Sequence, residues 1–103
     1  MEEKTIKELQ EYINTFVNDR KWQTPASDIL IHIFEELGEV ARNVLCIKNY
    51  GGEHTNDKKN NMDEELADLL YLLLKMSNES NVNLGKAFAS KMEKNTKRFP
   101  VNK

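Results

Sequence analysis

The fold is decided by two stretches of the sequence, "HIFEELGEVARNVL" (His32–Leu45) and "MDEELADLLYLLL" (Met62–Leu74). In both stretches apolar residues recur every three to four positions, which predicts amphipathic α-helices. Both also carry clustered carboxylates, although acids on such helices normally lie on the solvated face. The position of these acids relative to the apolar face therefore bears on what the protein does.

The helical phase of about 100° per residue turns several of these acids toward the apolar side. Around the second stretch Glu65 falls inside the apolar arc, and Asp68 lies at its edge. Around the first stretch Glu36 lies at the edge of the arc, and Glu39 lies further round on the same side. The residues expected to form the two apolar arcs are Leu30, Ile33, Phe34, Leu37, Val40, Ala41 and Val44, and Met62, Leu66, Leu69, Leu72, Leu73 and Met76.

Two helices are predicted in the first half of the chain. Thr5 and Glu8 form a T-x-x-E capping box, which starts a helix that fades near residues 18–21. Pro25 prevents this helix from continuing and is tolerated in the first turn of the next one. The second helix is expected over residues 26–49, ending before Tyr50, Gly51 and Gly52.

Two more helices are predicted in the second half. A polar, glycine-bearing loop leads to Asn61, which forms a second predicted capping box with Glu64 and opens a helix through about Ser77. Asn83 is positioned to cap a fourth helix that ends near Lys97. Four one-sided apolar stripes are buried most simply in an antiparallel four-helix bundle, so the expected fold class is all-α.

Length and composition limit the classes of partner. The 103 residues suit a single domain spanning residues 1–103, and a net charge of −2 gives no reason to expect nucleic acid or an acidic membrane as partner. The longest apolar run is too short and too acidic to span a bilayer, and the acidic start does not resemble a secretory signal. Cys46 is the single cysteine, so we expect no disulfide framework and no cysteine-based zinc site. A cytoplasmic location is the expectation.

Several acids that converge from two helices need a counter-charge. Two unit charges about 5 Å apart repel by roughly 3 kcal/mol at an effective dielectric constant near 20. A cation bound by Glu36, Glu39, Glu65 and Asp68 removes this repulsion, and ligation by oxygen alone selects Mg²⁺, or Mn²⁺ as a substitute. An E-E-x-x-E string by itself is typical of solvated helix faces, and the inward-facing Glu65 is what favours a metal site.

A di-iron centre is disfavoured, because such bundles use Glu-x-x-His pairs and no Glu stands three residues before His32 or His54. His32 is interpreted as a structural or supporting residue rather than as a ligand.

The paired motifs "EELGE" (Glu35–Glu39) and "EELAD" (Glu64–Asp68) resemble those of the MazG-like nucleotide pyrophosphohydrolases. These enzymes belong to the all-α nucleoside triphosphate pyrophosphatase superfamily, together with dCTP pyrophosphatases and dimeric dUTPases. "KMEKNTKRFP" near the end of the chain and "RKWQTP" before the second helix are also similar to the family. The resemblance implies Mg²⁺-dependent hydrolysis of a nucleoside triphosphate to the monophosphate and pyrophosphate, in an oligomer built on dimers.

The fourth helix carries candidate substrate-binding residues. Lys91, Asn95 and Arg98 recur on the face that begins with apolar residues, which indicates that this face meets an anionic object such as a phosphate. The alternative is that they are solvated residues near a helix C-terminus. Trp22 is a candidate for stacking on the base, although an aromatic residue before a helix is also typical of simple packing.

The candidate catalytic residues are Glu35, Glu36 and Glu39. We expect a carboxylate outside the full metal ligation, with Glu35 as the leading candidate, to take the proton from the attacking water. The preference for a particular nucleobase in the substrate stays open among dCTP, dUTP and modified or purine nucleotides. A non-catalytic interaction bundle with a vestigial acidic patch and a phosphoribosyl-ATP pyrophosphatase are the alternatives.

Self-association is expected from apolar residues that point away from the predicted arcs. Leu70 and Leu74 project roughly 100° to 140° from the centre of their arc, and Ile31 does likewise on its own helix. An exposed patch of this kind indicates an interface, so the sequence predicts a homodimer or a dimer of dimers.

Overall fold

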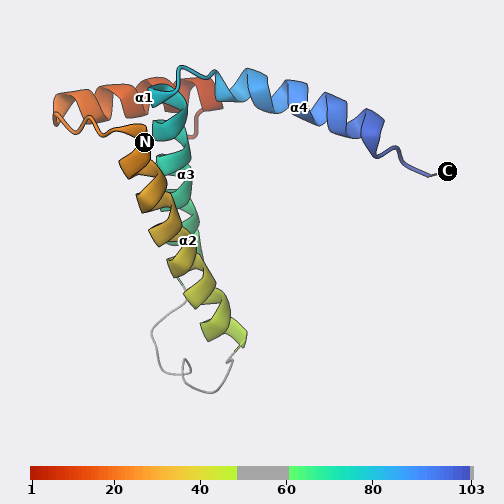
Figure 1. Ribbon diagram of the computed structural model, residues 1–103, viewed down its shortest axis with the longest axis horizontal. Helices are drawn as coiled ribbons and strands as arrows, with labels where there is room; N and C mark the ends of the chain where they lie inside the picture. Colours follow the sequence, from red (N-terminus) through yellow and green to blue (C-terminus); the bar gives the residue numbers. More distant parts are fainter. Residues whose placement is uncertain (49–60, 103) are drawn as a thin grey trace.

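The computed structural model describes residues 1–48 and 61–102, and in this part of the chain the secondary structure consists of helices alone. The prediction of an all-α fold with four helices is confirmed. The predicted end of the second helix and the loop that follows it lie outside the described residues. No described helix is both long enough and apolar enough to cross a membrane. The helices are α1 (Ile6–Asp19), α2 (Ala26–Lys48), α3 (Met62–Glu79) and α4 (Leu84–Arg98) (Figure 1).

Two of the predicted helix starts are confirmed by their hydrogen bonds. The Glu8 backbone N–H donates to the Thr5 hydroxyl at 3.2 Å, and the Thr5 N–H donates to the Glu8 carboxylate at 2.8 Å, which completes the capping box of α1. The Asn83 side chain accepts from the Lys86 N–H at 3.1 Å at the start of α4. These bonds satisfy backbone donors that have no partner within the helix.

The predicted capping box at the start of α3 is wrong. The Asn61 side chain makes no capping hydrogen bond, because its φ of −107° and ψ of 32° differ from the extended conformation of a capping residue. The Glu64 N–H donates instead to the Asp63 carboxylate at 2.9 Å. The Asn61 N–H donates to the Asn43 side-chain oxygen at 3.2 Å, so this helix start is tied to α2.

The end of α1 is a Schellman motif formed without glycine. Lys21 adopts the left-handed conformation with φ of 57°. Its N–H donates to the Asn18 carbonyl at 3.1 Å, and the Trp22 N–H donates to the Val17 carbonyl at 2.9 Å. The helix therefore ends where the sequence predicts, and it does so before Pro25 is reached.

The helices are arranged around an antiparallel hairpin of α2 and α3 (Figure 1). α1 crosses one end of this hairpin, and the apolar core lies between α1 and α3. Its buried members are Ile13, Val17 and Leu74, surrounded by half-buried residues that include Phe16 and Tyr71. α4 starts at the same end and runs away from the hairpin, with no buried residue along its length. Within one chain, α4 therefore does not lie alongside the other three helices.

The apolar face of α2 is shifted from its predicted position. Ile29 is buried, with an exposed fraction of 1%, and Ile33 and Val40 are half-buried. The predicted arc was wrong because α2 has apolar residues on two sides. The centre of the arc falls on the side that is exposed within one chain. The exposed members of the predicted arc include Leu30, Phe34, Leu37 and Val44.

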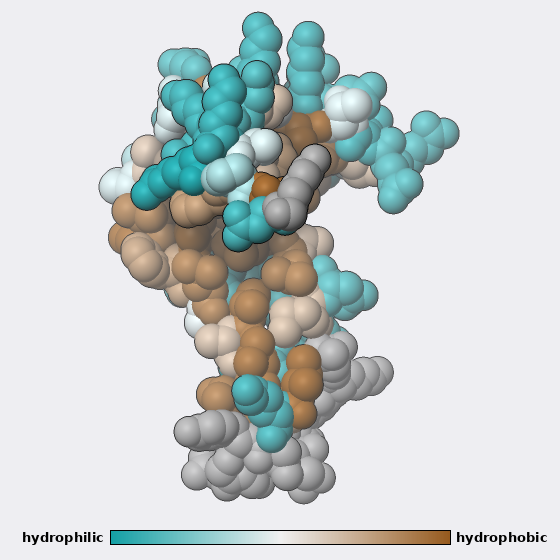
Figure 2. All heavy atoms as spheres, turned by 90° about the vertical axis from the view of Figure 1, so that its right-hand side faces the viewer, coloured by the Kyte–Doolittle hydropathy of each residue, from teal (hydrophilic) through white to brown (hydrophobic). Residues whose placement is uncertain are grey.

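The expectation for Leu74 was also wrong. Its exposed fraction is 2%, because it packs against α1 within the same chain rather than at an interface between copies. Leu70 and Ile31 are exposed, as expected. Figure 2 shows apolar side chains over much of the hairpin face on the side toward which α4 extends.

Candidate metal and substrate site

The packed face of α2 includes a carboxylate. Ile33, Glu36, Val40 and Asn43 follow each other at intervals of three and four residues, and each is half-buried. This spacing puts them on one side of the helix, toward α3. The apolar residues before and after Glu36 thus hold its carboxylate in the contact region between the two helices.

The facing side of α3 has the same pattern. Met62, Glu65 and Leu69 are half-buried at matching intervals, and Asp68 lies one turn from Glu65 on the edge. The antiparallel pairing brings these acids to Glu36. One carboxylate oxygen from each of Glu36, Glu65 and Asp68 lies within 4.8 Å of the others. The predicted convergence of acids from two helices is therefore present in the geometry.

Two oxygens of this cluster are buried without a partner. Glu36 Oε2 and Glu65 Oε2 have lost contact with solvent and accept no hydrogen bond from the described residues. A buried carboxylate oxygen without a donor is unfavourable, and a second one beside it adds repulsion. A hard divalent cation would supply the missing interaction for both oxygens, and oxygen donors are the ligands that Mg²⁺ prefers. The residues present thus fit a metal of this kind.

The electrostatics of the cluster agree with this fit. A hydrogen bond with the Glu39 carboxyl, burial, and the negative charges of Glu39 and Glu36 raise the pKa of Glu65 to about 7. Burial and the charge of Glu39 raise the pKa of Glu36. Among the described residues, no cation contributes to either pKa shift. The cluster therefore favours protons, or a cation in their place.

The raised pKa of Glu65 predicts how stability depends on pH. In the unfolded chain this carboxyl has its ordinary pKa of 4.5, and in the folded protein the pKa is about 7. The folded state binds the proton more tightly, so this stabilisation is complete below the unfolded pKa and is lost as the pH rises through about 7. Without divalent ions, we expect a higher melting temperature at about pH 5.5 than at about pH 7.5. A Glu65→Gln variant should show a smaller difference, and an equal difference would contradict the assignment.

The remaining predicted acids lie around the cluster. Glu39 is exposed and lies beside Glu36 and Glu65, close enough to raise the pKa of both. Glu35 is exposed and lies about 100° round α2 from Glu36. One of its oxygens lies 2.9 Å from His32 Nδ1, one turn earlier on the same helix. The structure thus places Glu39 at the cluster and Glu35 away from it.

The predicted phosphate-binding residues are not near the cluster of their own chain. Lys91, Asn95 and Arg98 lie on α4, which Figure 1 shows running away from the hairpin. Lys91 and Arg98 are exposed, and Asn95 is half-buried.

Trp22 lies in the α1–α2 connection and is 52% exposed. Its ring packs edge-on against Phe16, with the ring centres 5.9 Å apart. The Arg20 guanidinium also contacts this Phe16 ring and lies 3.8 Å from its centre. The start of α2 is about 15 Å along the helix axis from Glu36, so Trp22 is also separated from the acids.

Comparisons with known proteins agree with the geometry of the hairpin. Residues 23–102 match the model of the MazG nucleotide pyrophosphohydrolase domain. The uncharacterized protein YpjD of Bacillus subtilis (strain 168) is 27% identical over 96 residues, which cover 91% of this chain and 86% of YpjD.

Two crystal structures share the fold. A Bacillus-conserved MazG protein, a nucleotide pyrophosphohydrolase, superposes with a TM-score of 0.70 at 29% identity, over 91% of this chain and 92% of that one. YpjD from Bacillus subtilis superposes with a TM-score of 0.78 at 24% identity, over 98% and 100% of the two chains. Since the domain match spans most of the chain and includes both acidic motifs, the protein belongs to the MazG nucleotide pyrophosphohydrolase family.

Proposed function

We propose that the protein hydrolyses a nucleoside triphosphate to the monophosphate and pyrophosphate, with Mg²⁺ held by Glu36, Glu39, Glu65 and Asp68. The observation that supports this proposal most directly is the pair of buried, partnerless oxygens on Glu36 and Glu65, in a chain of this family. An acidic group on a helix surface is common, but two buried, partnerless carboxylate oxygens on adjacent helices are costly without a cation.

The acids have separate roles in this proposal. Glu36, Glu65 and Asp68 form the tight group that would hold the ion, and the ion would supply positive charge against the triphosphate oxygens. Glu39 lies beside that group and is open to solvent, so it is a candidate to complete the ligation or to accept a proton from water. Glu35 is the other candidate base, with His32 holding one of its oxygens.

The proposed reaction is a substitution at the α-phosphorus. The oxygen of a water molecule forms a bond to the α-phosphorus, and the bond from this phosphorus to the bridging oxygen of the β-phosphate breaks. The water proton passes to the candidate base, and pyrophosphate leaves with the bond electrons. Lys91 and Arg98 are proposed to stabilise the negative charge that develops on this leaving group.

The position of α4 implies that these cations serve another copy of the protein. Lys91, Asn95 and Arg98 are carried away from the acids of their own chain (Figure 1). The exposed apolar residues of α2 and α3 form a patch that a second copy can cover. We therefore propose a homodimer or a dimer of dimers, in which α4 of one protomer offers its cations to a nucleotide at the acids of its partner.

A substrate panel tests the proposed function. We expect pyrophosphate release from one or more members of a panel that contains dCTP, dUTP, purine triphosphates and phosphoribosyl-ATP. A chelator should abolish turnover while far-UV circular dichroism shows that the helices remain. Millimolar Mg²⁺ should raise the melting temperature, because the ion binds the folded state. If no compound is cleaved and Mg²⁺ leaves the melting temperature unchanged, the acidic patch is non-catalytic.

A further inference from the structure

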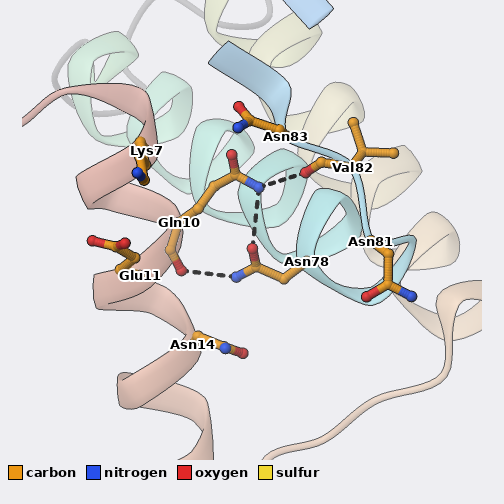
Figure 3. Close-up of a pocket in the computed structure, with 8 residues that line it drawn as sticks. All are labelled: Lys7, Gln10, Glu11, Asn14, Asn78, Asn81, Val82 and Asn83. Carbon is orange, nitrogen blue, oxygen red and sulfur yellow. Dashed lines mark hydrogen bonds between the residues drawn. The ribbon is translucent and has the colours of Figure 1, made fainter. Parts of the chain in front are cut away.

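Gln10 is a buried polar residue that none of the proposed chemistry uses. Its exposed fraction is 9%, and it lies on α1 among apolar residues. It lines a polar pocket of about 300 Å³ where α1, the end of α3 and the start of α4 meet. Figure 3 shows its side chain extending from α1 toward Asn78 and Val82. A buried amide in this place requires partners, and they lie on the elements that lead into α4.

The Gln10 side chain makes hydrogen bonds to the residues on both sides of Asn83, which caps α4. Its Nε2 donates to the Val82 carbonyl at 2.8 Å and to Asn78 Oδ1 at 3.1 Å. Its Oε1 accepts from the Leu84 N–H at 3.0 Å. Asn78 Nδ2 donates in return to the Gln10 carbonyl at 2.9 Å. Since Leu84 is the first residue of α4, Gln10 caps this helix from α1, while Asn83 caps it from within the chain.

The turn before α4 is fixed on its other side. Asn81 adopts the left-handed conformation with φ of 57°. Its N–H donates to the Asn78 carbonyl at 3.2 Å, and the Val82 N–H donates to the Ser77 carbonyl at 2.9 Å, which is a Schellman motif at the end of α3. Backbone hydrogen bonds thus fix the turn up to Val82, and the Gln10 side chain accepts from the backbone N–H of Leu84.

Beyond its first turn α4 has little else to hold its direction. Leu84 packs against the core, Gly85 lies near Ile6, and no residue of the helix is buried. Arg98 lies about 21 Å along the axis from Leu84, so a change of about 10° at the base displaces it by about 4 Å. A misplacement of about 1 Å can lower a reaction rate about 100-fold, so the attachment of the first turn matters for residues further along.

We propose that Gln10 is a positioning residue, which sets the direction of α4 and thereby the place of Lys91 and Asn95 at the acids of the partner. This role rests on the proposed function, in which those two residues contact the nucleotide. Gln10 acts through hydrogen bonds to the start of α4 and does not touch substrate.

Kinetics of Gln10→Leu test this role. This substitution keeps the size of the side chain and removes its bonds to Val82 and Leu84. We expect kcat/KM to fall about 10-fold to 100-fold. Mg²⁺ should still raise the melting temperature, because the hydrogen bonds of Gln10 reach α3 at Asn78, ten residues after Asp68. Gln10→Glu keeps an acceptor for Leu84 but sets its second oxygen against the Val82 carbonyl and Asn78 Oδ1, which repel it, so its loss should be at least as large. Gln10→Ala removes the same bonds and adds no charge, so it provides a measurable variant if Gln10→Leu does not fold.

The matched control is Val17→Ala, which weakens the same α1–α3 core and keeps the hydrogen bonds of Gln10 to Val82 and Leu84. Measured well below its melting temperature, it should keep near-normal kcat/KM. If the folded Gln10 variants are as active as the unaltered protein, or if Val17→Ala loses as much, the positioning role is overturned. An unaltered protein that releases no pyrophosphate would instead overturn the proposed function.

A distance measurement gives a readout that is independent of activity. Spin labels at Thr15→Cys on α1 and Lys94→Cys on α4, in a Cys46→Ala background and diluted with unlabelled protein, report the distance within one chain. We expect a narrow distance distribution, which Gln10→Leu broadens or shifts and Val17→Ala leaves unchanged. An unchanged distribution in Gln10→Leu would overturn the inference.

Discussion

Glu65→Gln is expected to lower turnover at least about 100-fold while raising the melting temperature of the metal-free protein. Loss of a residue that only supports a metal ligand already costs roughly 10-fold to 100-fold, and Glu65 is proposed as a ligand itself. The gain in stability has the opposite sign because ionised Glu65 is disfavoured. A hydrogen bond with Glu39, burial, and repulsion by the charges of Glu39 and Glu36 raise its pKa to about 7. The neutral amide removes this repulsion and keeps the shape of the side chain. Mg²⁺ should then raise the melting temperature less than in the unaltered protein.

Glu64→Gln is the matched control for this prediction. Glu64 is the neighbouring residue, exposed and turned about 100° from Glu65 on α3. It should keep near-normal pyrophosphate release and an unchanged response to Mg²⁺. A purely structural Glu65 predicts that both variants stay active. Normal turnover in Glu65→Gln, or an equal loss in the control, would show that the buried oxygens do not form a metal site.

The convergence of the acids was predictable because it follows from the helical phase alone. Glu65 stands inside the apolar arc of its helix, and an acid in that position has to face the neighbouring helix. Glu36 is flanked by Ile33 and Val40 on the packed side of α2 in the same way. The spacing of three and four residues is therefore enough to predict both the packing of the hairpin and the central acids of the candidate site.

The partners of the apolar faces were not predictable in the same way. A hydrophobic arc shows that a face is covered, but it does not show whether the cover comes from the same chain or from another copy. Leu74 illustrates the error, since its direction on α3 suggested an interface and α1 covers it. Phe34 illustrates the reverse error, because its place in the predicted arc suggested the core and the residue is 66% exposed.

The sequence contains a signal for the buried position of Gln10. On α1 it falls at helical spacing among Ile6, Ile13 and Val17, which face the core. A polar residue on such a face has to find partners, as the acids of the hairpin do. The identity of those partners depends on how the α3–α4 turn approaches α1, and helical periodicity contains no information about that approach.

Mixing two variants of low activity is expected to restore about a quarter of the normal activity, if α4 acts on the partner's acids. Lys91→Ala should lower turnover by removing a cation from the phosphates, and Glu65→Gln removes a metal ligand. After unfolding and refolding of an equal mixture, about half of the dimers contain one chain of each kind. In these mixed dimers one site has both defects and the other has neither, because each site takes its acids from one chain and its lysine from the other. One intact site in half of the dimers gives the quarter.

The opposite arrangement predicts no recovery at all. If Lys91 serves the acids of its own chain, every site in the mixed dimer carries one defect, and the mixture stays as inactive as its components. Light scattering before the assay must show dimers or larger assemblies, since a monomer would contradict the proposed interface directly. A mixture of Glu65→Gln with Asp68→Asn is the control, because both changes affect the acids of one chain and leave every site of a mixed dimer defective. Recovery in the first mixture and not in this control would show that α4 completes the site of its partner.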